Sequence, residues 1–289
     1  MYAFSILLDS MVNVIQTCMN SYNKIPNYIN YIPNECVYIG NDLHIRVGIT
    51  YAKKEVTLHL NDSNHALLVA GVSGSGKSNF INLAINQLLS YKDIELYLVD
   101  PKIVELGRYA NVSQCKCFAS EEEAITNLLT TILANIKSDY QKLLSNNQVK
   151  VRPYDKAKVL IVEELALLTK QQLKILSQIV AIGRGVGYRF IVSIQRADGN
   201  VMSNQLKSLL TTRIAYKCIN KANSELILED SIASNISIRG RCYVSVNGEI
   251  NEVQTYLINE ELKDNIINSN SNMENINNNN ININWIDSI

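Results

Sequence analysis

Short apolar runs alternate with helix-patterned segments through the middle of the chain. The apolar positions of Glu121–Leu144 recur at the spacing of one helical face, and Lys77–Ser90 and Lys170–Ile182 are also helix-patterned. Seven apolar runs predict strands: Ala66–Ala70, Glu95–Val99, Val159–Val162, Phe190–Ile194, Thr212–Tyr216, Cys242–Val246 and Val253–Ile258. The early runs are apolar throughout, which is typical of strands buried on both faces. The pattern predicts an α/β fold with a mostly parallel sheet flanked by helices.

Composition divides the chain into three zones. Residues 1–45 form an N-terminal helical or irregular segment, in which Phe4–Met19 has the pattern of an amphipathic helix. We expect that helix to pack on the body, and the alternative is a peripheral membrane or partner helix. Residues 46–262 carry the α/β pattern and form the predicted domain. Residues 263–289 are rich in Asn and predict a disordered tail.

Charge and composition exclude several classes of protein. The 289 residues contain 27 Lys+Arg, 27 Asp+Glu and 47% hydrophobic residues, which excludes a wholly disordered chain and a uniformly basic DNA-coating protein. The sequence contains no stretch of about eighteen uncharged apolar residues, so we expect no transmembrane helix. The N-terminus lacks the features of a signal peptide. The six cysteines have no zinc-site spacing, so we expect reduced thiols in a cytoplasmic protein.

The first apolar run leads directly into a phosphate-binding motif. The segment Gly71-Val72-Ser73-Gly74-Ser75-Gly76-Lys77-Ser78 matches the pattern G-x-x-x-x-G-K-[ST] in full. Its glycines allow the backbone to fold tightly around phosphate oxygens, and the following helix presents its positive N-terminal end. We expect Lys77 to contact the β- and γ-phosphates and the Ser78 hydroxyl to bind Mg²⁺. A buried strand before the motif and a helix after it are the context that a nucleotide site requires.

Polar residues follow directly after the strands that we expect beside this loop. Glu163 and Glu164 follow Val159–Val162, and carboxyl ends of parallel strands share one edge of the sheet. Glu163, one methylene longer than the usual Asp, would hold Mg²⁺, and Glu164 would polarise the attacking water as a general base. Gln195 ends the next apolar run and could sense the γ-phosphate or orient water. Arg184, in a Gly-Arg-Gly loop, could reach the nucleotide of a neighbouring subunit.

Four ordered segments carry a more specific signal. They are His65–Ser78, Val99–Leu106 with Tyr109, Val159–Leu165, and Gly183–Arg196, the last running on to Lys207, Thr212–Ala215 and Asn223–Leu228. Together they resemble the FtsK/SpoIIIE family of DNA-translocating ATPases, over roughly residues 55–260. The resemblance implies a RecA-like P-loop NTPase core that uses ATP and Mg²⁺. It also implies double-stranded DNA as a partner and a homo-oligomeric ring, expected to be a hexamer.

The resemblance also assigns roles by position. Glu163 falls on the Walker B acid, Glu164 on the catalytic glutamate, Gln195 on the sensor glutamine and Arg184 on the arginine that acts in trans. Asp100 and Lys102 match a family segment whose role does not follow from the sequence, and an interface position is one interpretation.

Chromosome translocases of this family carry N-terminal membrane helices and a C-terminal winged-helix module. The sequence pattern predicts neither of them here. This favours the motor core of a plasmid, phage or integrated mobile element. The N-terminal segment or the tail could then contact a membrane or a transfer machinery. From Val180 to Lys221 there are seven Lys/Arg and one acid, Asp198, which predicts an anion-facing surface in a DNA pore or in the nucleotide cleft.

Two other functions stay open at this point. One is a protein-secretion ATPase of the same superfamily, whose substrate is a polypeptide. The other is a non-motor nucleotide-binding accessory protein, in which Glu163 marks a decayed site. The sequence favours the DNA translocase because it predicts a single motor domain and no membrane helix.

Overall fold

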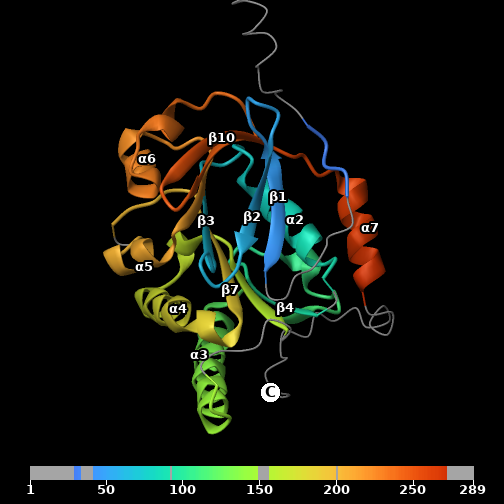
Figure 1. The fold of residues 1–289 in the computed structure, drawn as a ribbon, viewed down its shortest axis with the longest axis vertical. Coiled ribbons are helices and arrows are strands. Elements are labelled where there is room, and N and C mark those ends of the chain that lie inside the picture. The colour runs from blue at the N-terminus through green and yellow to red at the C-terminus, as the bar shows by residue number, and fades with distance from the viewer. Residues whose placement is uncertain (1–28, 34–41, 92, 149–155, 200, 272–289) are drawn as a thin grey trace, which may run out of the picture.

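A mixed sheet of ten strands runs through the part of the chain that the computed structural model describes, residues 29–33, 42–91, 93–148, 156–199 and 201–271 (Figure 1). The strand order is β2-β1-β10-β9-β8-β3-β7-β6-β4-β5. Six neighbouring strands are parallel: β8 (Thr212–Ala215), β3 (Ala66–Ala70), β7 (Tyr188–Ile194), β6 (Ala157–Val162), β4 (Ile94–Val99) and β5 (Cys115–Ala119). The predicted α/β fold with a mostly parallel sheet is confirmed.

Four antiparallel strands extend the sheet beyond β8. They are β9 (Arg241–Val246), β10 (Glu249–Thr255), β1 (Leu43–Ile49) and β2 (Glu55–Leu60). Asn247 and Gly248 join β9 to β10 with positive φ angles of 52° and 85°, as a two-residue hairpin turn requires. The sequence pattern predicted neither β1 nor β2, and β1 begins inside the segment that we had assigned to an N-terminal zone.

Helices cover both faces of the sheet and bury two apolar layers (Figure 1). On one face lie α2 (Lys77–Leu88) and α7 (Glu260–Asn270). On the other lie α3 (Glu122–Ser145), α4 (Lys170–Gly183), α5 (Asn204–Leu209) and α6 (Lys221–Leu228). Successive residues of β3 point into the two apolar layers in turn: Leu68 packs in the layer with α3 and α4, and Leu67 in the layer with α2. Among the described residues, no helix is long and apolar enough to cross a membrane.

The prediction that disorder begins at residue 263 is wrong, because α7 continues to Asn270. The Asn259 side chain caps the first turn by accepting from the Leu262 amide at 2.8 Å. Leu262, Ile266 and Ile267 then pack against the core layer on the α2 face. A local apolar stripe therefore outweighs the Asn-rich composition. The rest of the predicted tail and the predicted helix Phe4–Met19 lie outside the described residues.

Candidate nucleotide site

The phosphate-binding motif forms the turn between β3 and α2, at the carboxyl edge of the parallel strands. Gly71 and Gly76 have φ angles of 151° and 122°, which are unfavourable for any residue with a side chain. There is also no room for one, because a Cβ on Gly71 would lie 2.6 Å from Tyr216 Cβ and one on Gly76 would lie 3.0 Å from Gly240 Cα. Tyr216 and Gly240 therefore form a wall behind the loop that the motif itself does not reveal.

The open end of α2 is suited to an anion. Gly76 is the N-cap residue and supplies no side-chain hydrogen bond, so the first amides of α2 lack a side-chain acceptor. Within the loop, the Ser75 hydroxyl donates to the Val72 carbonyl at 2.6 Å and closes the turn, while Ser73 and Gly74 are exposed. An exposed loop of small residues at a helix N-terminus is the arrangement that binds phosphate groups.

Lys77 and Glu163 form a buried ion pair at the base of the loop. The Lys77 Nζ donates to Glu163 Oε1 at 2.7 Å, and both side chains are about 95% buried, with exposed fractions of 4% and 5%. Ser193, on β7, completes the group: its hydroxyl donates to Glu163 Oε2 at 2.6 Å and lies 3.2 Å from Lys77 Nζ. Ser193 was missed by the sequence analysis, because a hydroxyl within an apolar run gives no separate signal.

Glu164 lies beside this pair with a distinct backbone conformation. Its φ and ψ are 63° and 76°, a left-handed geometry that is costly outside glycine. The backbone amide of Gln195, not its side chain, donates to Glu164 Oε1 at 3.1 Å, and the backbone amide of Glu164 donates to the Ser193 hydroxyl at 3.1 Å. The other oxygen, Oε2, is buried without a hydrogen-bond partner among the described residues, and Lys102 Nζ lies 3.6 Å from it. The chain thus holds one carboxylate oxygen available to a further group.

These residues fit ATP and Mg²⁺. The uncapped end of α2 and the exposed loop suit the phosphates, and the unpartnered Glu164 oxygen suits a water molecule. Ser78 and Glu163 are the oxygen ligands that could hold Mg²⁺, which when bound supplies charge neutralisation at the phosphates. Glu163 is engaged by Lys77 and Ser193 in the described structure, so metal binding requires it to exchange partners.

The segment after β4 is organised by one buried carboxylate. Asp100 is 0% exposed and accepts from the backbone amides of Lys102 at 3.0 Å and of Glu105 and Leu106 at 2.9 Å. These bonds fold residues 101–106 into a compact loop, with Ile103 at a φ of 61°. The loop brings Lys102 Nζ to within 3.6 Å of Glu164 Oε2.

Replacing Asp100 with alanine should destabilise the protein by on the order of 3 kcal/mol, because it leaves buried amides without their charged acceptor. Asp230→Ala is the matched control, since exposed Asp230 accepts one backbone amide, that of Ile232. Denaturant unfolding of both variants measures the difference. Equal stabilities for the two would show that Asp100 does not hold the loop.

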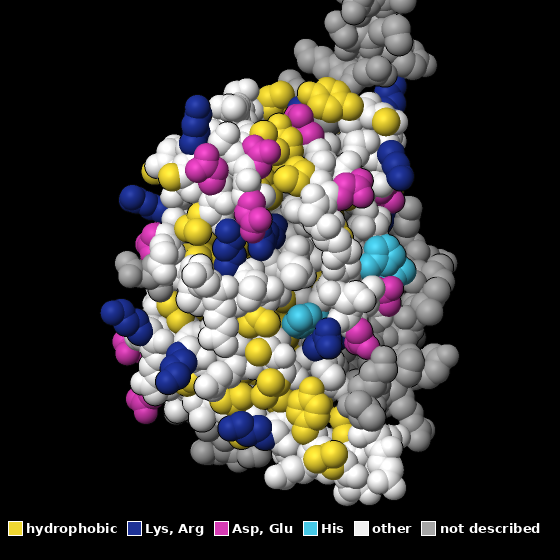
Figure 2. Space-filling view, turned by 60° about the vertical axis from the view of Figure 1, so that its left-hand side comes forward, with side chains coloured by type: hydrophobic (Ala, Val, Ile, Leu, Met, Phe, Trp, Pro, Cys, Tyr) yellow, Lys and Arg dark blue, Asp and Glu magenta, His cyan; other side chains and the backbone are white. Residues whose placement is uncertain are grey.

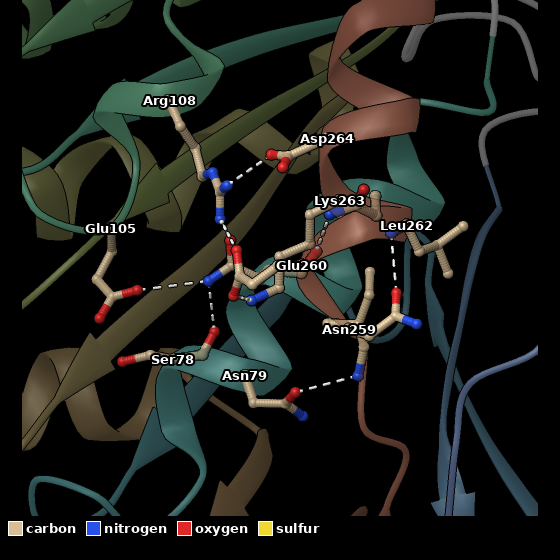
Figure 3. A network of polar contacts seen from close by, with 12 residues as sticks. Ser78, Asn79, Glu105, Arg108, Asn259, Glu260, Leu262, Lys263 and Asp264 are labelled. Carbon is tan, nitrogen blue, oxygen red and sulfur yellow. Dashed lines mark hydrogen bonds and ion pairs between the residues drawn. The ribbon is translucent and has the colours of Figure 1, made fainter.

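A second network ties α7 to the first turn of α2 (Figure 3). Asn79 donates to the Tyr256 carbonyl at 2.7 Å and accepts from the Ile258 amide at 3.2 Å. Arg108, in the loop after β4, contacts Glu260 at 3.0 Å and Asp264 at 2.9 Å, both on α7. The segment that follows β10 is therefore fastened to the helix that begins at the phosphate loop.

The structure places Arg184 away from this constellation. Arg184 is exposed and lies before β7, whereas Ser193 and Gln195 lie at the other end of that strand. An arginine at the amino edge of the sheet cannot complete the site at the carboxyl edge of the same chain. Any contact of Arg184 with a nucleotide would therefore involve another subunit.

The predicted basic surface is only partly exposed. Arg189 is 1% exposed and pairs with Asp62 at 3.0 Å, while Lys207 and Arg213 both contact Glu229 at 3.3 Å. Arg184, Arg196, Lys217 and Lys221 are exposed. On the side that carries α4, α5 and α6, Lys and Arg side chains stand among acidic ones and form no continuous stripe (Figure 2).

The two neighbouring cysteines of β5 are both thiols in the described structure. Cys115 and Cys117 are free, and burial raises the pKa of the Cys115 thiol to about 12.

Comparisons with known proteins agree with this geometry. The model of the FtsK/SpoIIIE family matches residues 40–198, more than half of the 289-residue chain. The chain is 28% identical over 197 residues to the DNA translocase FtsK of Helicobacter pylori strain J99, a match that covers 60% of this chain and 23% of that protein. It is 25% identical over 252 residues to the DNA translocase FtsK of Staphylococcus aureus strain Mu50, covering 78% of this chain and 32% of that protein. The chain thus spans at most about a third of the length of these relatives.

Solved structures show the same fold. The pCW3 conjugation coupling protein TcpA, in a monomer form with ATPγS, superposes with a TM-score of 0.73 at 21% identity, covering 86% of this chain and 75% of that one. The cytoplasmic domain of the type VII secretion ATPase EccC from Thermomonospora curvata gives a TM-score of 0.68 at 16% identity, covering 86% and 33%. The fold and the family match over residues 40–198 together show that the chain belongs to the FtsK/SpoIIIE family.

Proposed function

We propose that the chain is an ATPase that translocates double-stranded DNA, with ATP and Mg²⁺ as its cofactors. The observation that carries the proposal is the group formed by Lys77, Glu163, Ser193 and Glu164 at the carboxyl edge of the sheet, directly below the phosphate loop. Glu164 also has a left-handed backbone, a conformation found more often at functional positions than elsewhere.

We propose one role for each residue of the site. Residues Gly71–Ser78 hold the phosphates, with Lys77 on the β- and γ-phosphates and Ser78 and Glu163 at Mg²⁺. Glu164 accepts a proton from the attacking water, and the Gln195 amide fixes one of its oxygens. The left-handed backbone of Glu164 points its carboxylate into the site at the cost of local strain, a common property of catalytic positions.

We also propose that the active unit is a homo-oligomeric ring, expected to be a hexamer, with ATP hydrolysed between subunits. Three apolar side chains next to the site support this: Ile103, Val104 and Leu167 are 54%, 75% and 49% exposed. Ile103 and Val104 follow Lys102, and Leu167 follows Glu164, so the Lys102–Glu164 contact brings the two segments together. Exposed apolar groups beside a polar site suit a subunit interface, and Arg184 of the adjacent subunit would stabilise the transition state.

DNA is the substrate that we propose for the motor. The exposed Arg196, Lys217 and Lys221 follow β7 and β8 and lie at the carboxyl edge of the sheet, as the nucleotide site does. Lys217 lies against the phosphate loop, since its carbonyl accepts from the Val72 amide at 2.9 Å. Contacts to DNA would be made to phosphates, so binding should be salt-sensitive and largely independent of sequence. We place the protein in the cytoplasm, in the transfer of a mobile element, with a membrane or transfer-machinery partner.

A DNA-stimulated ATPase assay tests this function. We expect phosphate release to rise when linear double-stranded DNA is added, and the stimulation to fall as the salt concentration increases. Phosphate release is also measured with unfolded polypeptide in place of DNA, because a secretion ATPase would act on a polypeptide. Stimulation by polypeptide alone would support that rival, and no hydrolysis under any condition would support the accessory protein.

Mixing two inactive variants tests the arginine across the interface. Arg184→Ala subunits should bind ATP, because their phosphate loop is intact, and should lose on the order of 10³-fold in rate. Glu164→Gln subunits should also be inactive but still present Arg184 to a neighbour. We expect mixtures to regain part of the hydrolysis, at interfaces that pair an intact Glu164 with an intact Arg184. Absence of rescue at every ratio, after subunit exchange is confirmed, would remove Arg184 from the mechanism.

A further inference from the structure

Two histidines and one aspartate meet on the β1–β2 hairpin, away from the nucleotide site. His44 and His59 are opposite each other in the register of β1 and β2, and their ring centroids are 4.3 Å apart. Asp42 comes two residues before His44, and its Oδ2 lies 3.4 Å from His44 Nε2 and 3.3 Å from His59 Nδ1.

The two distances from Asp42 Oδ2 to the imidazole nitrogens fit a tetrahedral metal site. Metal–ligand distances of about 2.0–2.1 Å place the ligand atoms of a tetrahedral Zn²⁺ roughly 3.3–3.4 Å apart. The two distances from the aspartate oxygen to the imidazole nitrogens, 3.4 Å and 3.3 Å, agree with this ligand-to-ligand distance. One oxygen faces both rings, and all three potential ligand atoms lie within 4.8 Å of one another.

The hairpin holds these side chains in place while leaving them accessible. Leu43 and Ile45 are buried on the opposite face of β1, and the His44 amide donates to the Tyr91 hydroxyl at 2.7 Å. The side chains of His44, Asp42 and His59 remain 28%, 30% and 48% exposed, so an ion can reach them from solvent. The second oxygen of Asp42, Oδ1, is buried without a hydrogen-bond partner among the described residues. Little rearrangement would be needed to bind a cation.

We propose that Asp42, His44 and His59 bind one divalent transition-metal ion, Zn²⁺, with water as the fourth ligand. Two imidazole nitrogens and one carboxylate oxygen suit Zn²⁺, whereas Mg²⁺ and Ca²⁺ take oxygen ligands. The ion joins the start of β1 to the end of β2, the strand at the end of the sheet order. It is a structural link across the hairpin, independent of the proposed ATPase function.

Titration of the metal-free 289-residue chain with Co²⁺, in excess Mg²⁺, tests this site. Co²⁺ takes the same ligands as Zn²⁺ and reports them by its visible absorption, and the excess Mg²⁺ occupies oxygen-only sites. We expect one equivalent to bind at micromolar concentrations and to be displaced by Zn²⁺. His59→Gln and Asp42→Asn should each weaken binding by more than about tenfold, the loss that even an outer-shell change commonly causes.

His65→Gln is the matched control, because His65 is the third histidine of the chain and bonds the Val180 carbonyl instead. This variant should bind Co²⁺ like the wild type. Zn²⁺ should also raise the melting temperature of the wild type and of His65→Gln, but not that of His59→Gln. The proposal would be overturned if His59→Gln and Asp42→Asn bound Co²⁺ as tightly as the wild type. It would also be overturned if the wild type bound no Co²⁺ at concentrations about 100 times higher than the expected micromolar range.

Discussion

Replacing Lys77 with methionine is expected to lower ATP turnover by at least about 10²–10³-fold, because Lys77 is the cation that the phosphate-binding motif assigns to the β- and γ-phosphates. The structure adds a second effect, on stability. The substitution keeps the length of the side chain but leaves the Glu163 carboxylate buried without its ion pair. Loss of one partner of a buried pair commonly costs about 3–5 kcal/mol. Phosphate release and denaturant unfolding measure the two effects separately.

The double variant Lys77→Met/Glu163→Gln distinguishes the two effects. Removal of both charges should restore most of the stability, since the remaining neutral groups can still meet Ser193. It should restore none of the turnover. Wild-type hydrolysis by Lys77→Met would show that the nucleotide site is misassigned, and unchanged stability would show that the ion pair does not form in the nucleotide-free protein.

Glu164→Gln should slow hydrolysis by about 10²–10⁴-fold while ATP still binds, because the amide keeps the shape of the carboxylate but cannot accept a proton. The Gln195 amide can still donate to the remaining carbonyl oxygen, so the loop geometry should survive. Bound nucleotide, recovered after rapid removal of free ATP, should therefore be ATP and not ADP.

Glu105→Gln is the matched control for Glu164→Gln. Glu105 is a second carboxylate close to the site, where it lies 3.4 Å from the Asn82 amide, but it does not contact Glu164 in the described structure. We expect its turnover to stay near that of the wild type. If Glu105→Gln and Glu164→Gln turned over ATP equally well, Glu164 could not be the general base.

The parallel half of the fold was predictable because its strands are buried on both faces. Val159–Val162 and Phe190–Ile194 are continuous apolar runs, and the predicted positions of both fall within β6 and β7. The antiparallel half gave a weaker pattern. In β1, buried residues alternate with partly exposed ones such as His44 and Arg46, so no apolar run marks the strand. The predicted run Cys242–Val246 lies within β9, whereas the predicted run Val253–Ile258 overlaps only the end of β10.

The site was predictable to the extent that its residues lie in contiguous motifs. Gly71–Ser78 and the Glu163-Glu164 pair can be recognised in the sequence because their residues are adjacent. The structure brings Lys77 to Glu163, and the backbone amide of Gln195 to Glu164. Ser193 and Lys102 join them only through the register of β7 and the fold of the Asp100 loop. Such contacts depend on tertiary structure, so a sequence pattern does not reveal them. The partner of Arg184 stays a prediction for the same reason.

The strand order also has a consequence for synthesis of the protein. β1 joins the sheet through β10, and about 200 residues separate the end of β1 at Ile49 from the start of β10 at Glu249. At about 5–20 residues per second, a ribosome needs about 10–40 s to bridge that interval. During this time Gly48 and Ile49 lack their partners on β10, and the hairpin is held instead by α2, where the Gln87 side chain bonds the Arg46 backbone. Nascent chains that stall before Arg241 would leave the edges of β1 and β8 open together, and these are the products on which chaperones and proteases should act.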